Sequence, residues 1–384
     1  MSDAGDVMHL PRHAEIWLPG YLRAAVEARR EGRHRRGVTD IMLCVADHYE
    51  PMHNHASAAV GDARVAAWRD RLPLLAREFV DADGRHPQHT FFFPIEQYTE
   101  AHLDILAALA AQGLGEVEIH LHHEGDTADH LRRELLRFKQ TLHTRHGLLS
   151  RDPQGVVRYG FIHGDWALDN SLPDGSCCGV NDELTVLRDT GCYADFTMPA
   201  APSPAQTRTV NRIYYATGNP AAPRSHETGI RASVGRRPGD GSLLMVQGPL
   251  SLDWRRAKWG VVPRLENGSL HGGHPATLSR FANWLARGIS VEGRPDWVFV
   301  KAHTHGALEH NAAVLLGPQM RDFHRLLLAA YNDGERYRLH YVTAREMVNM
   351  IHAAEAGESG NPSVHRDYRY PPPPCRAPTA GIPR

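Results

Sequence analysis

Histidines and acidic residues follow directly after short apolar segments at four places in this sequence. The four groups are Asp47 and His48; His120, His122 and Asp126; His163, Asp165 and Trp166; and His303 and His305. Imidazole and carboxylate groups are the usual ligands of Zn²⁺, and they are also the acids and bases of hydrolytic enzymes. A single histidine is usually solvated or hydrogen-bonded, and the chain has 26 of them. Four such groups together nevertheless predict one metal-dependent active site.

The second group has the most informative spacing. Alternate side chains of a β-strand share a face, so His120 and His122 point the same way and can converge on one ion. Asp126 lies four residues beyond His122, where the chain turns toward a helix and can fold back. His303 and His305 repeat the His-x-His spacing after another apolar segment. The sequence therefore predicts a divalent metal, with Zn²⁺ favoured by the histidine-rich ligands.

Eight apolar segments alternate with stretches of helical periodicity, which is typical of repeated strand–helix units. The expected strands are 40–46, 90–95, 117–122, 159–163, 193–198, 243–247, 297–303 and 338–342. This order predicts an α/β fold, a regular or distorted (β/α) barrel of seven to eight strands, with long loops over the carboxyl-terminal face that carries barrel active sites. An open, doubly wound sheet is the alternative. No Gly-x-Gly-x-x-Gly follows the first strand, so no nucleotide cofactor is expected.

The other segments set the expected domain organisation. Residues 1–37 are predicted to form an N-terminal helical extension, residues 38–356 the catalytic barrel, and residues 357–384 a proline-rich, disordered tail. Residues 200–242 and 248–275 are rich in glycine and proline and lack periodicity. They are expected to be irregular insertions over the mouth of the barrel.

Composition restricts the classes of partner. The 384 residues include 42% hydrophobic and 23% charged residues, which suits a globular chain with a large core. The formal net charge of −1 indicates neither a nucleic-acid surface nor an anionic-membrane surface. We find no apolar run typical of a secretory signal or a membrane span, and the five cysteines are an odd number. These features predict reduced thiols and a cytoplasmic address.

The order of the motifs resembles the polysaccharide deacetylase superfamily of distorted (β/α) barrels, with this chain as a divergent member. The resemblance covers about residues 38–350. That family has an Asp-Asp pair after its first strand, a His-x-x-x-His motif after a later one, and a late histidine. Here the pairs read Asp47-His48 and His122-x-x-x-Asp126, so an acid and an imidazole are exchanged between the motifs. The family's Arg-x-Pro-Tyr motif has no match.

The resemblance implies roles for the matching residues. Asp47 would be the catalytic base that accepts a proton from a metal-activated water. The metal ligands would be His48, His122 and Asp126, with His120 or His123 able to replace any of them. His303 or His305 would be the general acid that stabilises the oxyanion and protonates the leaving group. The implied activity is the hydrolytic removal of an acyl group, held by an amide or ester bond, from a saccharide or saccharide precursor.

Six aromatic, basic or acidic residues outside the ligand set are expected to bind the substrate. They are His163, Asp165, Trp166, Trp254, Arg256 and Trp259. Tryptophan rings stack on sugars, and arginine binds carboxylate or phosphate groups. A helix with tryptophan in the core and basic side chains in solvent is the competing interpretation. Alternative functions are a glycoside hydrolase with paired carboxylates, a metal-dependent phosphoesterase and a sugar-binding relative without activity.

Overall fold

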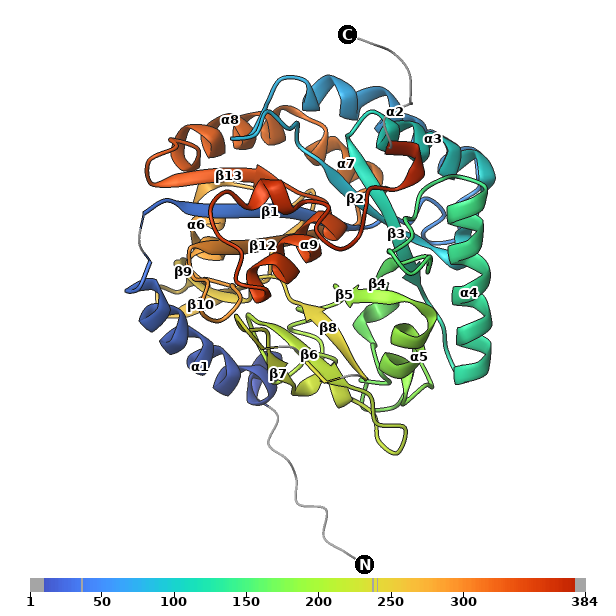
Figure 1. Cartoon of the computed structure of the whole chain (residues 1–384), viewed down its shortest axis with the longest axis horizontal. Helices are drawn as coiled ribbons and strands as arrows, with labels where there is room; N and C mark the ends of the chain where they lie inside the picture. Colours follow the sequence, from blue (N-terminus) through green and yellow to red (C-terminus); the bar gives the residue numbers. More distant parts are fainter. Residues whose placement is uncertain (1–9, 36, 237, 240, 377–384) are drawn as a thin grey trace, which may run out of the picture.

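The computed structural model describes residues 10–376, apart from residues 36, 237 and 240. Within that part, 11 strands belong to one hydrogen-bonded mixed sheet and two more form a separate antiparallel hairpin (Figure 1). The strands are β1 (Thr39–His48), β2 (His89–Pro94), β3 (Gly115–Leu121), β4 (Tyr159–His163), β5 (Cys192–Asp195), β6 (Ile213–Thr217), β7 (Ile230–Arg231), β8 (Ser242–Val246), β9 (Ser251–Lys258), β10 (Val262–Glu266), β11 (Ser269–Leu270), β12 (Trp297–Thr304) and β13 (Tyr337–Tyr341).

Each of the eight strands expected from the sequence overlaps an observed strand, namely β1 to β5, β8, β12 and β13. They are buried on both faces. In β1, Ile41 and Leu43 pack into the core on one side of the sheet, while Met42 and Cys44 pack into the core on the other. A strand covered on both faces reads as a continuous apolar run, which explains why these segments stand out in the sequence.

The prediction of a (β/α) barrel is wrong, because the sheet does not close among the described residues. Its strands follow the order β11-β12-β1-β2-β3-β4-β5-β8-β6-β7, with β13 attached to β1. Two features of the strand pairing explain why the sheet stays open. Strand β8 takes the antiparallel strand β6 on its free edge, and one edge of β1 is shared, with residues 39–43 pairing with β13 and residues 46–48 pairing with β2. The fold is a sheet-centred α/β arrangement.

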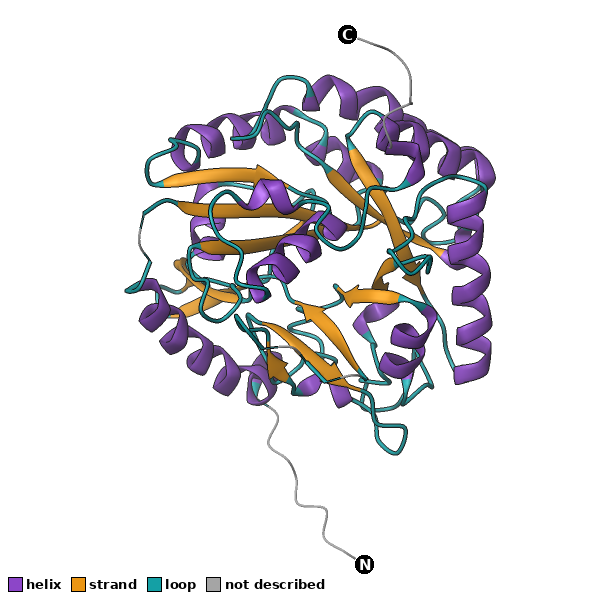
Figure 2. Cartoon of the chain, viewed as in Figure 1, coloured by secondary structure: helices purple, strands orange, loops and turns teal. Residues whose placement is uncertain are grey.

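Helices cover the outer side of the curved sheet, and Figure 2 shows them as a peripheral layer around the strands. They are α1 (Ala14–Gly32), α2 (Ala58–Ala76), α3 (Glu100–Ala111), α4 (Ala128–Thr144), α5 (Glu183–Thr190), α6 (Leu278–Leu285), α7 (Glu309–Leu315), α8 (Pro318–Tyr331) and α9 (Ala344–Glu355). Helix α9 differs from the others because Met347, Met350 and Ile351 pack with Met42 and Phe92 in the core on the inner face.

The two long insertions are more regular than expected. Residues 200–242 contain β6 and β7, and residues 248–275 contain β9, β10 and β11. The prediction of irregular loops is therefore wrong for these stretches. Strand β6 extends the main sheet beyond β8, and β11 extends it beyond β12. Helix α1, within the predicted N-terminal extension, packs Trp17 against Val210 and Leu250 of the insertions. Residues 1–9 and 36 of that extension lie outside the described residues.

Residues 357–376 are folded against the body of the protein, so the prediction of a disordered tail is wrong for them; residues 377–384 lie outside the described residues. Arg366 is buried and donates a hydrogen bond to Glu346 at 2.9 Å. Tyr370 is also buried, and its carbonyl accepts a hydrogen bond from Arg345. Buried polar contacts and the packing of Tyr370 against Tyr193 hold this segment in place.

A search of the described helices for a membrane-crossing segment, long and apolar enough to span a bilayer, finds none.

Candidate metal centre

A single carboxylate, that of Glu50, lies close to three imidazoles from the ends of two strands, β3 and β12. Its Oε1 atom lies 3.4 Å from Nε2 of His120, 3.8 Å from Nε2 of His122 and 3.6 Å from Nε2 of His305. His48 completes a compact group with Glu50 and His120, whose ligand atoms all lie within 4.8 Å of one another. We call these five residues the Glu50 cluster. Glu50 itself is only 3% exposed.

Strand register explains why these side chains meet. Strand β1 pairs with β12 in parallel, with Asp47 opposite Thr304, so the next residues, His48 and His305, leave the sheet side by side. Their rings stack with centroids 4.7 Å apart. His48 and Glu50 are two residues apart on the chain that leaves β1. His120 lies on β3, and the centroid of its ring is 5.0 Å from that of the His48 ring.

The hydrogen bonds on the far side of the rings fix which nitrogen faces Glu50. Nδ1 of His120 donates to the carbonyl oxygen of Ile162 at 2.8 Å, and Nδ1 of His122 donates to Glu96 at 2.6 Å. Both acceptors are oxygens without a proton to give, so the neutral ring carries its lone pair on Nε2. This carboxylate- or carbonyl-oriented tautomer is typical of metal-binding histidines.

The geometry fits a divalent ion. Ligands about 2.1 Å from a tetrahedral ion stand about 3.4 Å from one another. Nε2 of His120 lies 3.4 Å from Oε1 of Glu50, and the ligand atoms of His48, Glu50 and His120 all lie within 4.8 Å of one another. The buried Nε2 atom of His120 has no hydrogen-bond partner within the described structure. An acceptor nitrogen facing a carboxylate oxygen is unfavourable unless a proton or a cation lies between them. The residues present therefore fit a metal ion.

The centre is open on one side. The side chains of His122 and His305 are 30% and 29% exposed. His53, one-third exposed, contacts the second oxygen of Glu50 through Nδ1 at 2.6 Å. The half-buried indole of Trp166 lies 5.8 Å from the ring of His48 and 6.1 Å from that of His305. His122 and His305 are therefore the members of the Glu50 cluster nearest to solvent, and Trp166 lies beside His305.

Burial favours the neutral form of two imidazoles of the Glu50 cluster, His48 and His305. Burial lowers the pKa of His48 and of His305, and for His48 the neighbouring imidazole of His305 lowers it further. His122 differs: burial lowers its pKa, but the hydrogen bond to Glu96 and the charge of Glu50 raise it more. Metal ligation requires the unprotonated lone pair, so the low pKa of His48 suits a ligand.

Asp47 lies behind the cluster rather than in its open side. It is fully buried, and its Oδ2 contacts Nε2 of His89 at 2.7 Å while its Oδ1 accepts from the backbone N–H of Gly306 at 2.6 Å. A side chain at Gly306 would collide with Asp47, because its Cβ would stand 2.1 Å from Oδ2. With both oxygens engaged, Asp47 holds the turn after His305; the structure does not present it to a water as the expected base.

His303 is buried next to His48, with ring centroids 6.3 Å apart. Burial and the charge of Lys301 lower its pKa well below the usual range. Of the two late histidines considered for the general acid, only His305 has an ion-pair distance to Glu50 in the described structure.

Asp126 does not join the Glu50 cluster, contrary to its expected role as a ligand. Its carboxylate contacts His123 at 3.1 Å and His130 at 2.8 Å. His163, expected to bind substrate, is buried on the same side, with Nε2 3.5 Å from Glu183. Successive residues along an extended chain point in opposite directions, which sends His122 to Glu50 and His123 to Asp126 and Glu183.

The remaining expected substrate residues are divided between two places. Asp165 and Trp166 lie in the short turn Gly164–Trp166, after β4, and Asp165 is exposed there. Trp254, Arg256 and Trp259 lie on the β9–β10 hairpin, where the two indoles are 62% and 78% exposed. Arg256 donates to Nε2 of His274 at 2.9 Å. No contact in the described structure joins these hairpin residues to the Glu50 cluster, and their tryptophans are not core residues.

A further acid–histidine group, formed by Asp81, Asp83 and His340, is a salt-bridge network. His340 contacts Asp83 at 2.6 Å and Asp40 at 2.9 Å, and Arg366 lies 3.4 Å from Asp81. Two arginines already neutralise these acids, since Arg338 binds Asp40 at 2.7 Å. We therefore assign this group to stability rather than to metal binding.

This network makes a pH-dependent prediction for His340→Gln. Burial lowers the pKa of His340, but its hydrogen bonds to Asp40 and Asp83 raise it more. Its stabilisation is therefore complete below the unfolded pKa of about 6.5 and is lost as the pH rises through the higher folded value. We expect urea unfolding to show a loss of about 2 kcal/mol at pH 6 and a much smaller loss at pH 9. The exposed His34→Gln serves as control, and an equal loss at both pH values would contradict the assignment.

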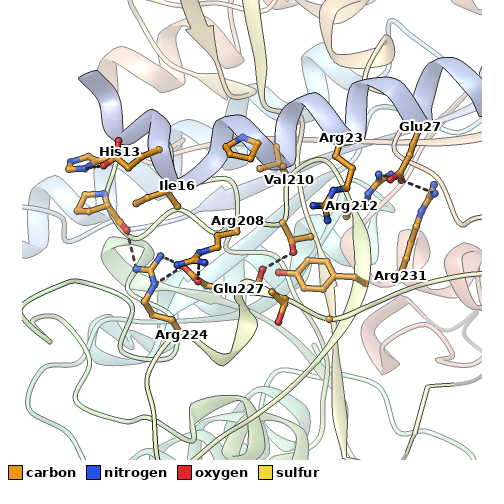
Figure 3. Close-up of a pocket in the computed structure, with 18 of the residues that line it drawn as sticks. His13, Ile16, Arg23, Glu27, Arg208, Val210, Arg212, Arg224, Glu227 and Arg231 are labelled. Atoms are coloured by element: carbon orange, nitrogen blue, oxygen red, sulfur yellow. Dashed lines mark hydrogen bonds and ion pairs between the residues drawn. The ribbon is translucent and has the colours of Figure 1, made fainter. Parts of the chain in front are cut away.

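A cavity with a volume of about 820 Å³ lies elsewhere, between α1 and the segment that contains β6 and β7 (Figure 3). Its walls are rich in arginine, and Arg208, Arg212, Arg224 and Arg231 each have an acidic partner. Arg212 contacts Glu27, and Arg208 contacts Glu227 at 3.1 Å. The cavity offers no grouping of imidazoles with a carboxylate like that around Glu50, so we place the chemistry at the strand ends.

Glu50 was not among the ligands expected from the sequence, although its spacing from His48 could have indicated it. Glu50 lies two residues after His48, which is the same spacing that pairs His120 with His122. Glu96 and His89, which orient His122 and Asp47, carry no comparable signal, because their partners lie 26 and 42 residues away.

A comparison of the sequence with models of known protein families finds no match, and neither does a comparison with curated proteins.

Proposed function

We propose that this protein is a metal-dependent hydrolase, and that the Glu50 cluster is its active site. The observation that supports it most is the convergence of three imidazole Nε2 atoms on Oε1 of Glu50, at 3.4 to 3.8 Å. In this proposal His48, Glu50 and His120 hold the ion, with Zn²⁺ favoured by the donor set, and His122 approaches from the open side. The ion would supply Lewis acidity to the scissile carbonyl and to the attacking water.

In this proposal the residues around the ion transfer the proton, position His305 and exclude water. His305 is the proton carrier: its Nε2 faces the site from the open side, takes a proton from the water and returns it to the leaving group. Asp47 is a positioning residue, because its bond to the N–H of Gly306 holds the turn that follows His305. Trp166 forms an apolar wall next to His48 and His305, and this wall excludes water from one side of the substrate.

The substrate class in this proposal is an acylated saccharide or saccharide precursor, and the reaction is the removal of the acyl group. An indole beside a hydrolytic centre suits a sugar ring. A cytoplasmic address is part of the proposal, supported by five cysteines that are all free thiols.

The test is acetate release from a panel of N-acetylated and O-acetylated saccharides. The protein as purified is expected to release acetate. Removal of the metal with a chelator is expected to lower the rate by at least about tenfold, and added Zn²⁺ is expected to restore it. His305→Gln is expected to lower kcat by about 100-fold or more while metal content is retained, and the exposed His310→Gln is the matched control. Absence of bound metal, together with no activity under any added divalent ion, would overturn the proposal.

A further inference from the structure

A second group of metal-ligand residues lies behind the Glu50 cluster, and the proposed activity does not use it. It consists of Glu183, His123, His163 and Cys178, whose ligand atoms all lie within 4.8 Å of one another. We call it the Glu183 cluster. Oε1 of Glu183 lies 3.3 Å from Nε2 of His123 and 3.5 Å from Nε2 of His163, while Oε2 lies 3.5 Å from Sγ of Cys178.

The cluster is closed to solvent. The side chains of Glu183 and His163 are fully buried, that of His123 is 6% exposed, and Cys178 is fully buried. The four residues come from different elements. His123 follows β3, His163 ends β4, Cys178 lies in the loop before α5, and Glu183 is the first residue of α5, which Figure 1 places beside β5.

A hydrogen bond on the far side of His163 and an ion-pair contact on the far side of His123 orient the two imidazoles toward the centre of the cluster. Nδ1 of His163 donates to the carbonyl oxygen of Gly164 at 2.6 Å, so its Nε2 is an acceptor. That buried Nε2 atom has no hydrogen-bond partner within the described structure, and it faces a carboxylate oxygen. Nδ1 of His123 lies 3.1 Å from Asp126, the carboxylate behind the ring that metal-binding histidines commonly have.

We infer that the Glu183 cluster is a second, structural metal site that takes Zn²⁺. One thiolate, two imidazoles and one carboxylate form a donor set that Zn²⁺ binds tetrahedrally. The site offers four protein ligands and no open position, whereas the Glu50 cluster has an exposed side; this is the difference between structural and catalytic zinc sites. On binding, the Cys178 thiol loses its proton to solvent and the sulfur coordinates as thiolate.

The second ion would join the loop after β3 to the start of α5. A backbone bond already links the two loops, from the N–H of Asp126 to the carbonyl oxygen of Cys178 at 2.9 Å. His122 of the Glu50 cluster and His123 of the Glu183 cluster are adjacent in sequence. The structural ion therefore fixes the backbone that presents His122. The inference does not depend on the hydrolase proposal, since it concerns metal content alone.

Elemental analysis and cobalt spectroscopy of the full chain test this inference. We expect about two Zn²⁺ per chain in the wild type, and one in Cys178→Ser and in His163→Gln. After replacement by Co²⁺, a thiolate-to-metal charge-transfer band in the near ultraviolet is expected in the wild type and in Glu50→Gln, but not in Cys178→Ser. Cys177→Ser, the neighbouring half-buried thiol, is the matched control and retains both the band and the metal.

The results that would overturn the inference are equally definite. A wild-type protein with a single equivalent of metal that Glu50→Gln removes would show that the Glu183 cluster is only a hydrogen-bond network. A Co²⁺-substituted wild type without the charge-transfer band would exclude the thiolate ligand. The metal count and the Co²⁺ spectrum remain informative even if Cys178→Ser does not fold, because they use the wild type and the Glu50→Gln variant.

Discussion

Glu50→Gln is expected to remove the catalytic metal and to lower kcat/KM by at least about 100-fold. The substitution keeps the size of the side chain but replaces an anion by a neutral amide. Three imidazole nitrogens face Oε1 of Glu50 within 3.8 Å, so this carboxylate supplies the only negative charge that the Glu50 cluster presents to the ion among the described residues. Metal content of the purified variant, measured together with acetate release, gives both results on one sample.

The matched control for this variant is Glu124→Gln. Glu124 is an exposed acid beside His123 and takes no part in the contacts around Glu50. It is expected to keep wild-type metal content and rate. A Glu50→Gln protein that retains its full metal complement and turns over normally would refute Glu50 as a ligand, and with it the active site proposed here.

Arg345→Met is expected to lower the free energy of unfolding by about 3–5 kcal/mol. Arg345 is 3% exposed and binds Glu116, itself 2% exposed, through two hydrogen bonds of 2.8 and 3.0 Å. A third bond reaches Asp367 at 2.7 Å. The substitution leaves the buried charge of Glu116 with fewer partners and releases the C-terminal segment. Urea unfolding followed by circular dichroism measures the change.

Arg325→Met is the matched control, because the Arg325–Asp322 pair on α8 is exposed on both sides and is expected to contribute less than about 1 kcal/mol. In a double-mutant cycle, Glu116→Gln combined with Arg345→Met is expected to cost less than the sum of the single changes, since each removes the same contact. A loss of less than about 1 kcal/mol for Arg345→Met would show that the buried pair does not hold the segment.

The strands were predictable because their signal is local. Each of the eight is an apolar run between polar segments, and burial on both faces leaves that run uninterrupted. The start of a helix is also a local feature. At the N-terminus of α9, Thr343 and Glu346 exchange hydrogen bonds within four consecutive residues. The grouping of histidines after four strands was also visible, because parallel strands bring their carboxyl ends to one edge.

Closure of the sheet was not predictable in this way. Strands β13 and β2 both pair with β1, and β13 lies about 300 residues from β1 in the sequence, so no local pattern gives their register. The apolar pattern of each strand is also the same in a closed barrel and in an open sheet. The antiparallel partner β6 came from a stretch rich in glycine and proline, where strand signals are weak.

The sequence by itself determined the strands, the histidine and acidic side chains that follow them and the edge of the sheet at which these side chains gather, because all three follow from residue type and short-range periodicity. Only the tertiary structure decided which of these side chains lie together. It sends His122 and Glu50 to one group and His123, His163 and Glu183 to another, because neighbouring side chains leave an extended chain in opposite directions. It also decided that residues 357–376 fold, because buried ion pairs such as Arg366 with Glu346 join segments that no local pattern connects.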